Sequence, residues 1–392
     1  MRRSARAAVA VIGAVLVIGV GWPAASATRM AAARTPGWRA VQYFGQCTSA
    51  GVQSVTATGP AGGWAAGQAW RFQCDQPGLM IARWDGRAWQ DLRPPAAFGV
   101  TPSGESIGHA VAALSPTYAW TFVNRASFPH PAVESFALLW RNGHWRTFRL
   151  ADGATFFSAV AFSRSNAWAF GGIGTNVFSP TQLDSYAVRY DGKRWRSVPI
   201  PVLPMGTAAP SPSNIWAVGP APGDVYKLAH WNGRRWRTAA LPFLKDVTGS
   251  YSSASVVSDG SGGAWVAAGT QTFNNQDEYV PAGGALLHWA GGTWHEAHVP
   301  FTTVGLGPLS RDGHGGLWVA SYRAAQCTAC DYLEMGRYRA RHWSLSRLRV
   351  PGATVTAMRL IPGTTSVWAS ASGALASDGQ SDTIGVIFKY GP

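Results

Sequence analysis

One short pattern recurs along the whole chain and constrains its fold more than any other feature. Seven tryptophans that are each followed by Ala, Val or Thr recur at similar spacing, at Trp64, Trp120, Trp168, Trp216, Trp265, Trp318 and Trp368. The steps between these tryptophans are 56, 48, 48, 49, 53 and 50 residues. A period of roughly 40–50 residues built from short apolar runs is typical of β-propeller blades. The sequence therefore predicts an all-β, seven-bladed β-propeller of four-stranded antiparallel blades.

A second pattern follows each of the first six tryptophans and indicates a hairpin. It has an aromatic residue, a short turn and another tryptophan, at residues 84–89, 140–145, 190–195, 231–236, 289–294 and 338–343. Five copies contain Asp-Gly, Asn-Gly or Gly-Gly, which tolerate the positive φ of a tight hairpin turn. The sixth copy has Ala340-Arg341 instead and has lost the glycine. We therefore expect a looser turn there.

Each repeat divides into four strands, named A to D from the propeller axis outward. Strand A is small and apolar, as in Ser158–Phe162, strand B carries the first tryptophan, and the hairpin joins strands C and D. In a propeller, the A–B and C–D turns lie on one face, here called the bottom, and the B–C and D–A loops lie on the other, the top. We expect the tryptophans to pack between adjacent blades, because large aromatic side chains bury the most area.

The two ends of the chain complement each other. The last strand C, Gly385–Tyr390, is followed only by Gly391 and Pro392, so the seventh repeat has no strand D of its own. Near the N-terminus, Pro36–Val41 matches Lys193–Val198, which begins the strand D of the third repeat. We therefore expect the N-terminal strand to complete the last blade, which closes the ring and removes an exposed sheet edge.

The N-terminal residues have the pattern of a targeting segment. Residues 1–27 combine a basic start, an apolar run from Ala7 to Gly21 and the small residues Ala25-Ser26-Ala27, which is typical of a cleaved secretory signal. The predicted organisation is a signal peptide at 1–27, a short segment at 28–35 and the propeller at 36–392. From this organisation we expect a secreted, extracellular protein that has no membrane span once the signal is cleaved. A twin-arginine export route and an uncleaved anchor are the alternatives.

Arginine dominates the charge of the chain. Without Arg2, Arg3 and Arg6 of the predicted signal, 30 basic side chains face 19 acidic ones, and only four of the basic residues are lysine. Basic residues concentrate on the outer strand D, as at Arg146 and Arg149, whereas ten acidic residues, Glu134 among them, fall in or beside the B–C loops. This pattern predicts a basic outer belt and an acidic top face. Nucleic acid is not an expected partner of a secreted chain with so few lysines.

The four cysteines are expected to form disulfides, as is usual in secreted proteins. Cys47 and Cys74 lie in two loops of the first blade that share the top rim, so a bridge between them is plausible. Cys327 and Cys330 form a C-x-x-C in a B–C loop, and we expect a local disulfide between them. Metal binding would need further ligands nearby, and none is evident.

The candidate binding site lies in the long B–C loops of the top face, because loops on a rigid scaffold commonly carry binding residues. The loop around residues 270–282 combines amides, carboxylates and aromatic rings, a composition that suits sugar hydroxyls. The predicted ligand-binding residues are Asp184, Asn274, Asn275, Asp277, Glu278, Asp331 and Glu334. No motif for catalysis, a metal or a cofactor is present.

The hairpins resemble the Asp-box of sialidase-like (BNR-repeat) propellers, most closely at Asp85–Trp89 and Gly291–Trp294. The resemblance implies the fold only, because the arginine triad, tyrosine and glutamate of sialidases have no matching set here. Secreted actinobacterial propellers with Trp-Ala-Val-Gly and His-Trp-Asn-Gly repeats are also similar, as at residues 216–219 and 230–233.

Two functional hypotheses follow. The first is a secreted, monomeric, non-enzymatic binding or scaffolding propeller whose top face recognises a cell-surface glycan or a protein partner. The second is a carbohydrate-active enzyme, a glycoside hydrolase or lyase, with carboxylates on the top face. A hydrolase needs two carboxylates about 5–10 Å apart in a cleft, whereas a binding module does not.

Overall fold

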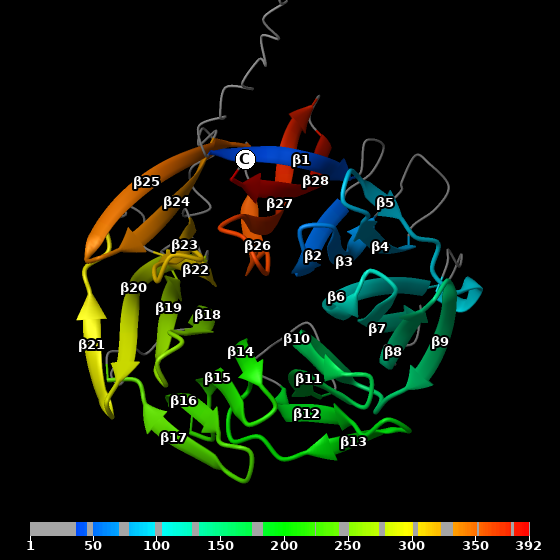
Figure 1. Cartoon of the computed structure of the whole chain (residues 1–392), viewed down its shortest axis with the longest axis horizontal. Helices are drawn as coiled ribbons and strands as arrows, with labels where there is room; N and C mark the ends of the chain where they lie inside the picture. Colours follow the sequence, from blue (N-terminus) through cyan, green and yellow to red (C-terminus); the bar gives the residue numbers. More distant parts are fainter. Residues whose placement is uncertain are drawn as a thin grey trace, which may run out of the picture. The chain divides into compact units, whose positions relative to one another are not determined.

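The computed structural model describes residues 37–44, 50–69, 78–98, 104–127, 133–174, 183–223, 225–242, 251–273, 279–300, 305–322, 332–350, 353–377 and 380–391. In this part the chain forms 28 β-strands and one short 3-10 turn, η1 (Ala96–Phe98). The strands lie in seven four-stranded antiparallel sheets around a common axis (Figure 1). The predicted seven-bladed β-propeller is confirmed, and a compact unit covers Thr35–Pro392.

The four strand classes recur in the same order in each blade, and the blades are numbered 1 to 7 in the chain order of their A strands. The A strands are β2 (Ala50–Gly59), β6 (Gly104–Ser115), β10 (Ala154–Ser163), β14 (Gly206–Ser211), β18 (Tyr251–Ser258), β22 (Gly305–Arg311) and β26 (Thr354–Leu360). The B strands are β3 (Gly62–Ala69), β7 (Tyr118–Ser127), β11 (Asn166–Ile173), β15 (Asn214–Pro220), β19 (Ala264–Phe273), β23 (Leu317–Tyr322) and β27 (Val367–Ser377). The C strands are β4 (Gly78–Trp84), β8 (Val133–Arg141), β12 (Asp184–Tyr190), β16 (Tyr226–Trp231), β20 (Tyr279–Ala290), β24 (Tyr332–Arg339) and β28 (Gln380–Tyr390). The D strands are β5 (Trp89–Asp91), β9 (His144–Arg149), β13 (Trp195–Val198), β17 (Trp236–Ala240), β21 (Thr293–Ala297), β25 (His342–Arg349) and, for blade 7, β1 (Trp38–Phe44).

The N-terminal strand occupies the outer position of blade 7. Strand β1 pairs antiparallel with β28, with Trp38 opposite Tyr390 and Phe44 opposite Gly385 (Figure 1). The Trp38 ring lies 5.2 Å from that of Trp318 in blade 6, measured between centroids, so it also contacts the neighbouring blade. Arg39 donates a hydrogen bond to the carbonyl oxygen of Gly391. This arrangement is the one expected for a ring closed by the N-terminal strand.

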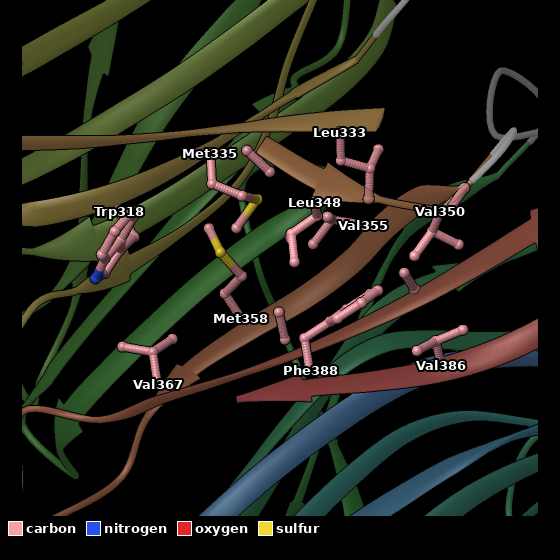
Figure 2. Close-up of a cluster of buried hydrophobic side chains, with 14 residues drawn as sticks. Trp318, Leu333, Met335, Leu348, Val350, Val355, Met358, Val367, Val386 and Phe388 are labelled. Atoms are coloured by element: carbon pink, nitrogen blue, oxygen red, sulfur yellow. The ribbon is translucent and has the colours of Figure 1, made fainter. Parts of the chain in front are cut away.

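Each blade-to-blade interface contains its own apolar core. The described residues form seven buried clusters, and each cluster draws on two neighbouring blades. Figure 2 shows the cluster between blades 6 and 7, where Met335 and Leu348 face Met358 and Phe388. Six of the seven strand-B tryptophans are fully buried, and Trp265 is partly buried. The tryptophans therefore pack between blades, as the sequence predicts.

The hairpin of blade 6 differs from the sequence prediction. Ala340 and Arg341 have φ of 49° and 64°, close to the left-handed φ values of Asn142 (48°) and Gly143 (92°) in blade 2. Tyr338 pairs with Trp343 and Arg339 with His342, so the turn has two residues and is as tight as its glycine-containing counterpart. The expectation of a looser turn was wrong, because the pairing on both sides holds the backbone in place despite the missing glycine.

Turns at the bottom face are held by side-chain caps. The Asp85 Oδ1 accepts hydrogen bonds from the N–H groups of Arg87 and Ala88, at 2.8 and 2.9 Å, and Asp191 and Asn232 do the same in blades 3 and 4. In the A–B turn of blade 6, the fully buried Asp312 accepts from the N–H groups of His314 and Gly316 and from Arg337 Nε at 2.8 Å. These capping side chains of the bottom-face turns therefore serve the fold.

Candidate functional site: a charged cluster on the top of blade 2

Two of the predicted ligand-binding residues lie in the described part of the chain. Asp184 is exposed and begins β12, opposite Ile173 of β11. Glu334 lies within β24 and not in a loop, and only 5% of the residue is exposed. The predicted residues Asn274, Asn275, Asp277, Glu278 and Asp331, and all four cysteines, lie outside the described residues. Their assignments stay predictions.

Glu334 faces an arginine of the outer strand. Its Oε1 lies 3.6 Å from Nε of Arg347, which sits directly opposite on β25. The Arg347 side chain is largely exposed, whereas the carboxylate is not. The backbone oxygen of Glu334 accepts a hydrogen bond from Ser321 Oγ at 3.2 Å. This carboxylate is therefore part of the blade, and Asp184 is the more accessible of the two residues.

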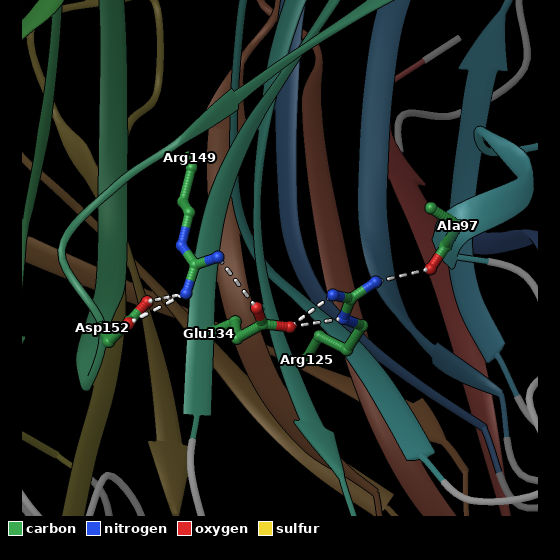
Figure 3. Close-up of polar contacts among 5 residues, drawn as sticks. All are labelled: Ala97, Arg125, Glu134, Arg149 and Asp152. Atoms are coloured by element: carbon green, nitrogen blue, oxygen red, sulfur yellow. Dashed lines mark hydrogen bonds and ion pairs between the residues drawn. The ribbon is translucent and has the colours of Figure 1, made fainter.

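A cluster of four charged side chains lies on the top of blade 2 (Figure 3). It comprises Arg125 near the end of β7, Glu134 at the start of β8, Arg149 at the end of β9 and Asp152 in the D–A connection. Glu134 Oε2 accepts from Arg125 Nε at 2.8 Å, and its Oε1 lies 3.3 Å from Arg149 Nη1. Arg149 Nη2 donates to Asp152 Oδ2 at 3.0 Å. Arg149 thus bridges the two carboxylates.

An aromatic base supports one end of the blade 2 cluster. The Arg125 guanidinium lies 5.2 Å from the Phe136 ring centroid and 5.8 Å from that of Phe98, and the two rings are 4.9 Å apart. Arg125 Nη1 also donates to the carbonyl oxygen of Ala97 in η1, at 3.2 Å. Cation–π contacts and hydrogen bonds to blade 1 therefore fix this guanidinium in place. The other end is open, with Arg149 and Asp152 side chains 60% and 58% exposed.

Sequence analysis missed the blade 2 cluster because it assigned acidic and basic residues to separate surfaces. Arg149 belongs to the predicted basic belt and Glu134 to the predicted acidic top, yet the two side chains contact each other. The missed signal is the position of these charges. Each lies at the top end of its strand or in the adjoining connection, and antiparallel pairing brings the top ends of neighbouring strands together.

A second set of polar residues repeats from blade to blade and has a structural role. Opposite the strand-B tryptophan, strand C places a histidine or a cation in six blades and Leu139 in blade 2. For example, His288 stacks on Trp265 at 4.2 Å, and Arg337 lies 5.7 Å from Trp318. His288 Nε2 lies 2.9 Å from Asp259 Oδ2, which resembles a catalytic pair. The equivalent pair in blade 6 is Arg337 with Asp312, so an arginine replaces the histidine. Histidine and arginine can both stack on the strand-B tryptophan and hold the turn aspartate in place, but arginine does not exchange protons near neutral pH. We therefore assign these pairs a structural role.

The pKa values of these aspartates reflect their caps. Burial raises the pKa of the Asp312 carboxyl, but the N–H groups of His314 and Gly316 together with Arg337 outweigh it, so the pKa lies below its usual value. Asp259 is lowered in the same way, with His288 and the N–H groups of its turn outweighing burial. Both carboxylates are ionised at neutral pH, as a turn cap requires.

In the part of the chain that the structure describes, no group of three or more His, Cys, Asp or Glu side chains is arranged to hold a metal ion. Among the same residues, no helix has the length and apolarity needed to cross a membrane.

Comparison with known proteins defines the class of the chain by its fold. No family model matches the sequence, and no curated protein matches it. Similar solved structures include the GH93 α-L-arabinofuranosidase of Fusarium graminearum with arabinobiose, at 7% identity and a TM-score of 0.50, covering 90% of this chain and 97% of that one. The SapL1 lectin with α-methyl fucoside is 14% identical, with a TM-score of 0.46 and coverage of 78% and 97%. The β-propeller domain of the Trilobed protease from Pyrococcus furiosus is 8% identical, with a TM-score of 0.49 and coverage of 88% and 94%.

These likenesses concern the fold alone, since every identity is far below 25%. The chain is a β-propeller whose solved neighbours include sugar-binding and sugar-cleaving proteins. The resemblance to Asp-box propellers and to secreted actinobacterial propellers stays a prediction from the sequence.

Proposed function

We propose that the protein is a secreted, non-enzymatic binding module that recognises a cell-surface glycan through its top face. The observation that carries this proposal is the blade 2 cluster: an exposed Arg149–Asp152 pair, anchored through Glu134 to an arginine that rests on two aromatic rings. Secretion rests on the signal-like sequence of residues 1–27.

The chemistry of the blade 2 cluster suits sugar hydroxyls. A guanidinium offers several N–H donors in a fixed plane, and a carboxylate offers acceptors, so adjacent hydroxyls of a sugar ring can bind both. Because Arg149 is already oriented by Glu134 and Asp152, little conformational entropy is lost when a ligand binds. None of the blade-packing clusters includes these side chains, so a ligand contacts them without disturbing a core.

The alternative of a glycoside hydrolase is less well supported by the same cluster. A general acid must carry a proton while a second carboxylate stays ionised. Glu134 and Asp152 both contact the Arg149 guanidinium, and Glu134 contacts a second one from Arg125. These contacts suit acceptors of fixed orientation. The fold leaves both functions open, and the cluster favours binding.

The test is a glycan-array screen of the purified protein, followed by affinity measurements on any glycan retained. Arg149→Ala is expected to lower the affinity by about tenfold or more, the effect of losing hydrogen bonds to a charged group. Arg196→Ala is the matched control, because Arg196 is also a strand-D arginine, is 57% exposed and pairs with Asp191, but at the bottom face. This control should bind like the wild type.

Three results would contradict the proposal. They are retention of no glycan on the array, an equal loss of affinity in the Arg149→Ala and Arg196→Ala variants, and cleavage of a bound glycan during incubation. Cleavage would favour the hydrolase, and capture of a protein without any glycan would favour a protein-binding module.

A further inference from the structure

A cavity of about 380 Å³ lies at the bottom end of the propeller axis. All seven A strands line it, each through the residues that precede its A–B turn. Most of these residues are small or apolar, such as Ala57, Ala113, Ala161 and Ala209. The volume falls within the usual range of small-molecule sites. The blade 2 cluster lies on the opposite face, so this cavity is independent of the proposed glycan site.

Two arginines from adjacent blades give the axial cavity a positive charge. Arg311 ends β22 in blade 6, and Arg359 lies near the end of β26 in blade 7. Among the described residues that line the cavity, these two are the charged ones, and none is acidic. Low-dielectric walls around charges of one sign concentrate ligands of the opposite sign.

Arg359 is partly buried and has no carboxylate partner among the described residues. Its Nη1 donates to the carbonyl oxygen of Met358 at 3.2 Å, and no ion pair involves it within the described part of the chain. Arg337 differs, because it pairs with the buried Asp312 at 2.8 Å. Burial lowers the pKa of Arg359, which reflects the cost of a cation held away from water and from any anion. An anion in the cavity would remove that cost.

Further hydrogen-bond donors line the axial cavity. The A strands are the inner edge of every sheet, so one side of their backbone is not used in strand pairing. The buried hydroxyl of Ser258 lines the cavity and accepts from the N–H of Gly260 at 3.2 Å, which leaves its proton free to donate. Arg311 packs against Gly260 so closely that a Cβ there would lie 2.9 Å from its Nη2, so this glycine makes room for the guanidinium.

We propose that the axial cavity at the bottom face binds a small oxyanion group, held by Arg359 and Arg311. The shared chemistry is that of a phosphate or a carboxylate, which guanidinium groups bind through paired N–H donors. The two sources are a free or sugar-linked phosphate and a sugar acid.

The test uses inorganic phosphate and D-glucuronate as probes, with D-glucose as the uncharged comparison and chloride to hold the ionic strength constant. Affinity is measured by calorimetry and by the rise in melting temperature that a ligand of the folded state causes. The wild type is expected to bind at least one of the two anions in a saturable manner and to ignore glucose. Phosphate binding alone indicates a phosphate ligand, and glucuronate binding alone indicates a sugar acid.

The variants separate a binding role from a structural one. Arg359→Met and the double variant Arg311→Met/Arg359→Met should lose at least tenfold in affinity for the anion. Without any anion, Arg359→Met should melt at the same temperature as the wild type or higher, because it removes a partly buried cation that has no carboxylate partner. Arg235→Met, in an exposed hairpin turn, is the control and should bind normally. Absence of saturable binding of both anions to the wild type, or unchanged affinity in the double variant, would overturn the proposal.

Discussion

At the scale of single residues, the blade 6 hairpin adopts a tight turn although its sequence does not favour one. Ala340 and Arg341 hold the left-handed backbone that Asn142 and Gly143 hold in blade 2. For residues other than glycine this conformation costs roughly 1–2 kcal/mol each. The pairing of β24 with β25 along its whole length outweighs that cost. The loss of the turn glycine therefore leaves the backbone geometry of the blade 6 hairpin unchanged.

Exchanging the two turns tests this explanation. The double variant Ala340→Asn/Arg341→Gly should raise the free energy of unfolding by about 1–2 kcal/mol, since it relieves the left-handed strain. The reverse exchange, Asn142→Ala/Gly143→Arg, should lower it by a similar amount. Urea unfolding of both variants is the measurement. Two variants of unchanged stability would show that the turns carry no strain.

His109 provides a pH test at the same scale. A register shift in β6 leaves it out of the β6–β7 ladder, and burial lowers its pKa to about 4. Between pH 6.5 and pH 4 the unfolded chain therefore binds a proton that the folded chain does not, so stability falls as the pH falls through this window. At pH 4.5 the wild type should have lost about 2–3 kcal/mol through this group, and His109→Gln should lack that loss. Parallel stability curves for the two proteins would contradict the assignment.

At the scale of strands and blades, the sequence predicted what repeats and missed what is unique. The B and C–D tryptophans recur at nearly constant spacing because every interface between blades needs the same large side chains. Within the described residues, the blade 2 cluster and the axial arginines each occur once, and they arise from which strand ends meet around the ring. Arg125 and Glu134 come together through the pairing of β7 with β8, and Arg311 and Arg359 line one cavity because their blades meet at the axis. Periodicity carries no information on either arrangement.

The buried and half-buried tryptophans of a blade should differ in their contributions. Trp216 in strand B is almost fully buried and stacks on His230 at 3.9 Å. Trp236 in strand D is partly exposed, and its Nε1 donates to the carbonyl oxygen of Pro199 at 3.0 Å. We expect Trp216→Ala to cost about 3–5 kcal/mol and Trp236→Ala clearly less. Thermal unfolding of the two variants measures this, and an equal loss would contradict the assignment of strand B to the core.

At the scale of the whole molecule, every blade depends on both of its neighbours. Hydroxyl groups link the A strands near the axis: Ser255 Oγ accepts from the N–H of Leu309 at 3.0 Å, and Thr356 donates to the carbonyl oxygen of Val52. The second of these joins blade 7 to blade 1. Seven interfaces of similar composition then form a closed ring, and in every blade the outer edge is a strand D.

Closure of the ring depends on the few residues of strand β1. Strand β1 supplies the outer edge of blade 7, and Trp38 packs against the cluster between blades 6 and 7. The axial cavity requires an intact ring, since all seven A strands line it. A protein without β1 should retain most of its strands but lose the cooperative unfolding of a closed propeller.

The most direct test of closure is the melting temperature of a variant that lacks residues 28–44, compared with the intact protein and with Trp38→Ala. Loss of a fully buried tryptophan costs about 3–5 kcal/mol, and each kcal/mol lowers the melting temperature of a large domain by about 2 °C. Because Trp38 is only partly buried, Trp38→Ala should lower the melting temperature by less, about 2–4 °C. The account predicts a fall of at least about 5 °C, with a broadened transition, for the truncation. An unchanged melting temperature in the truncated protein would contradict it.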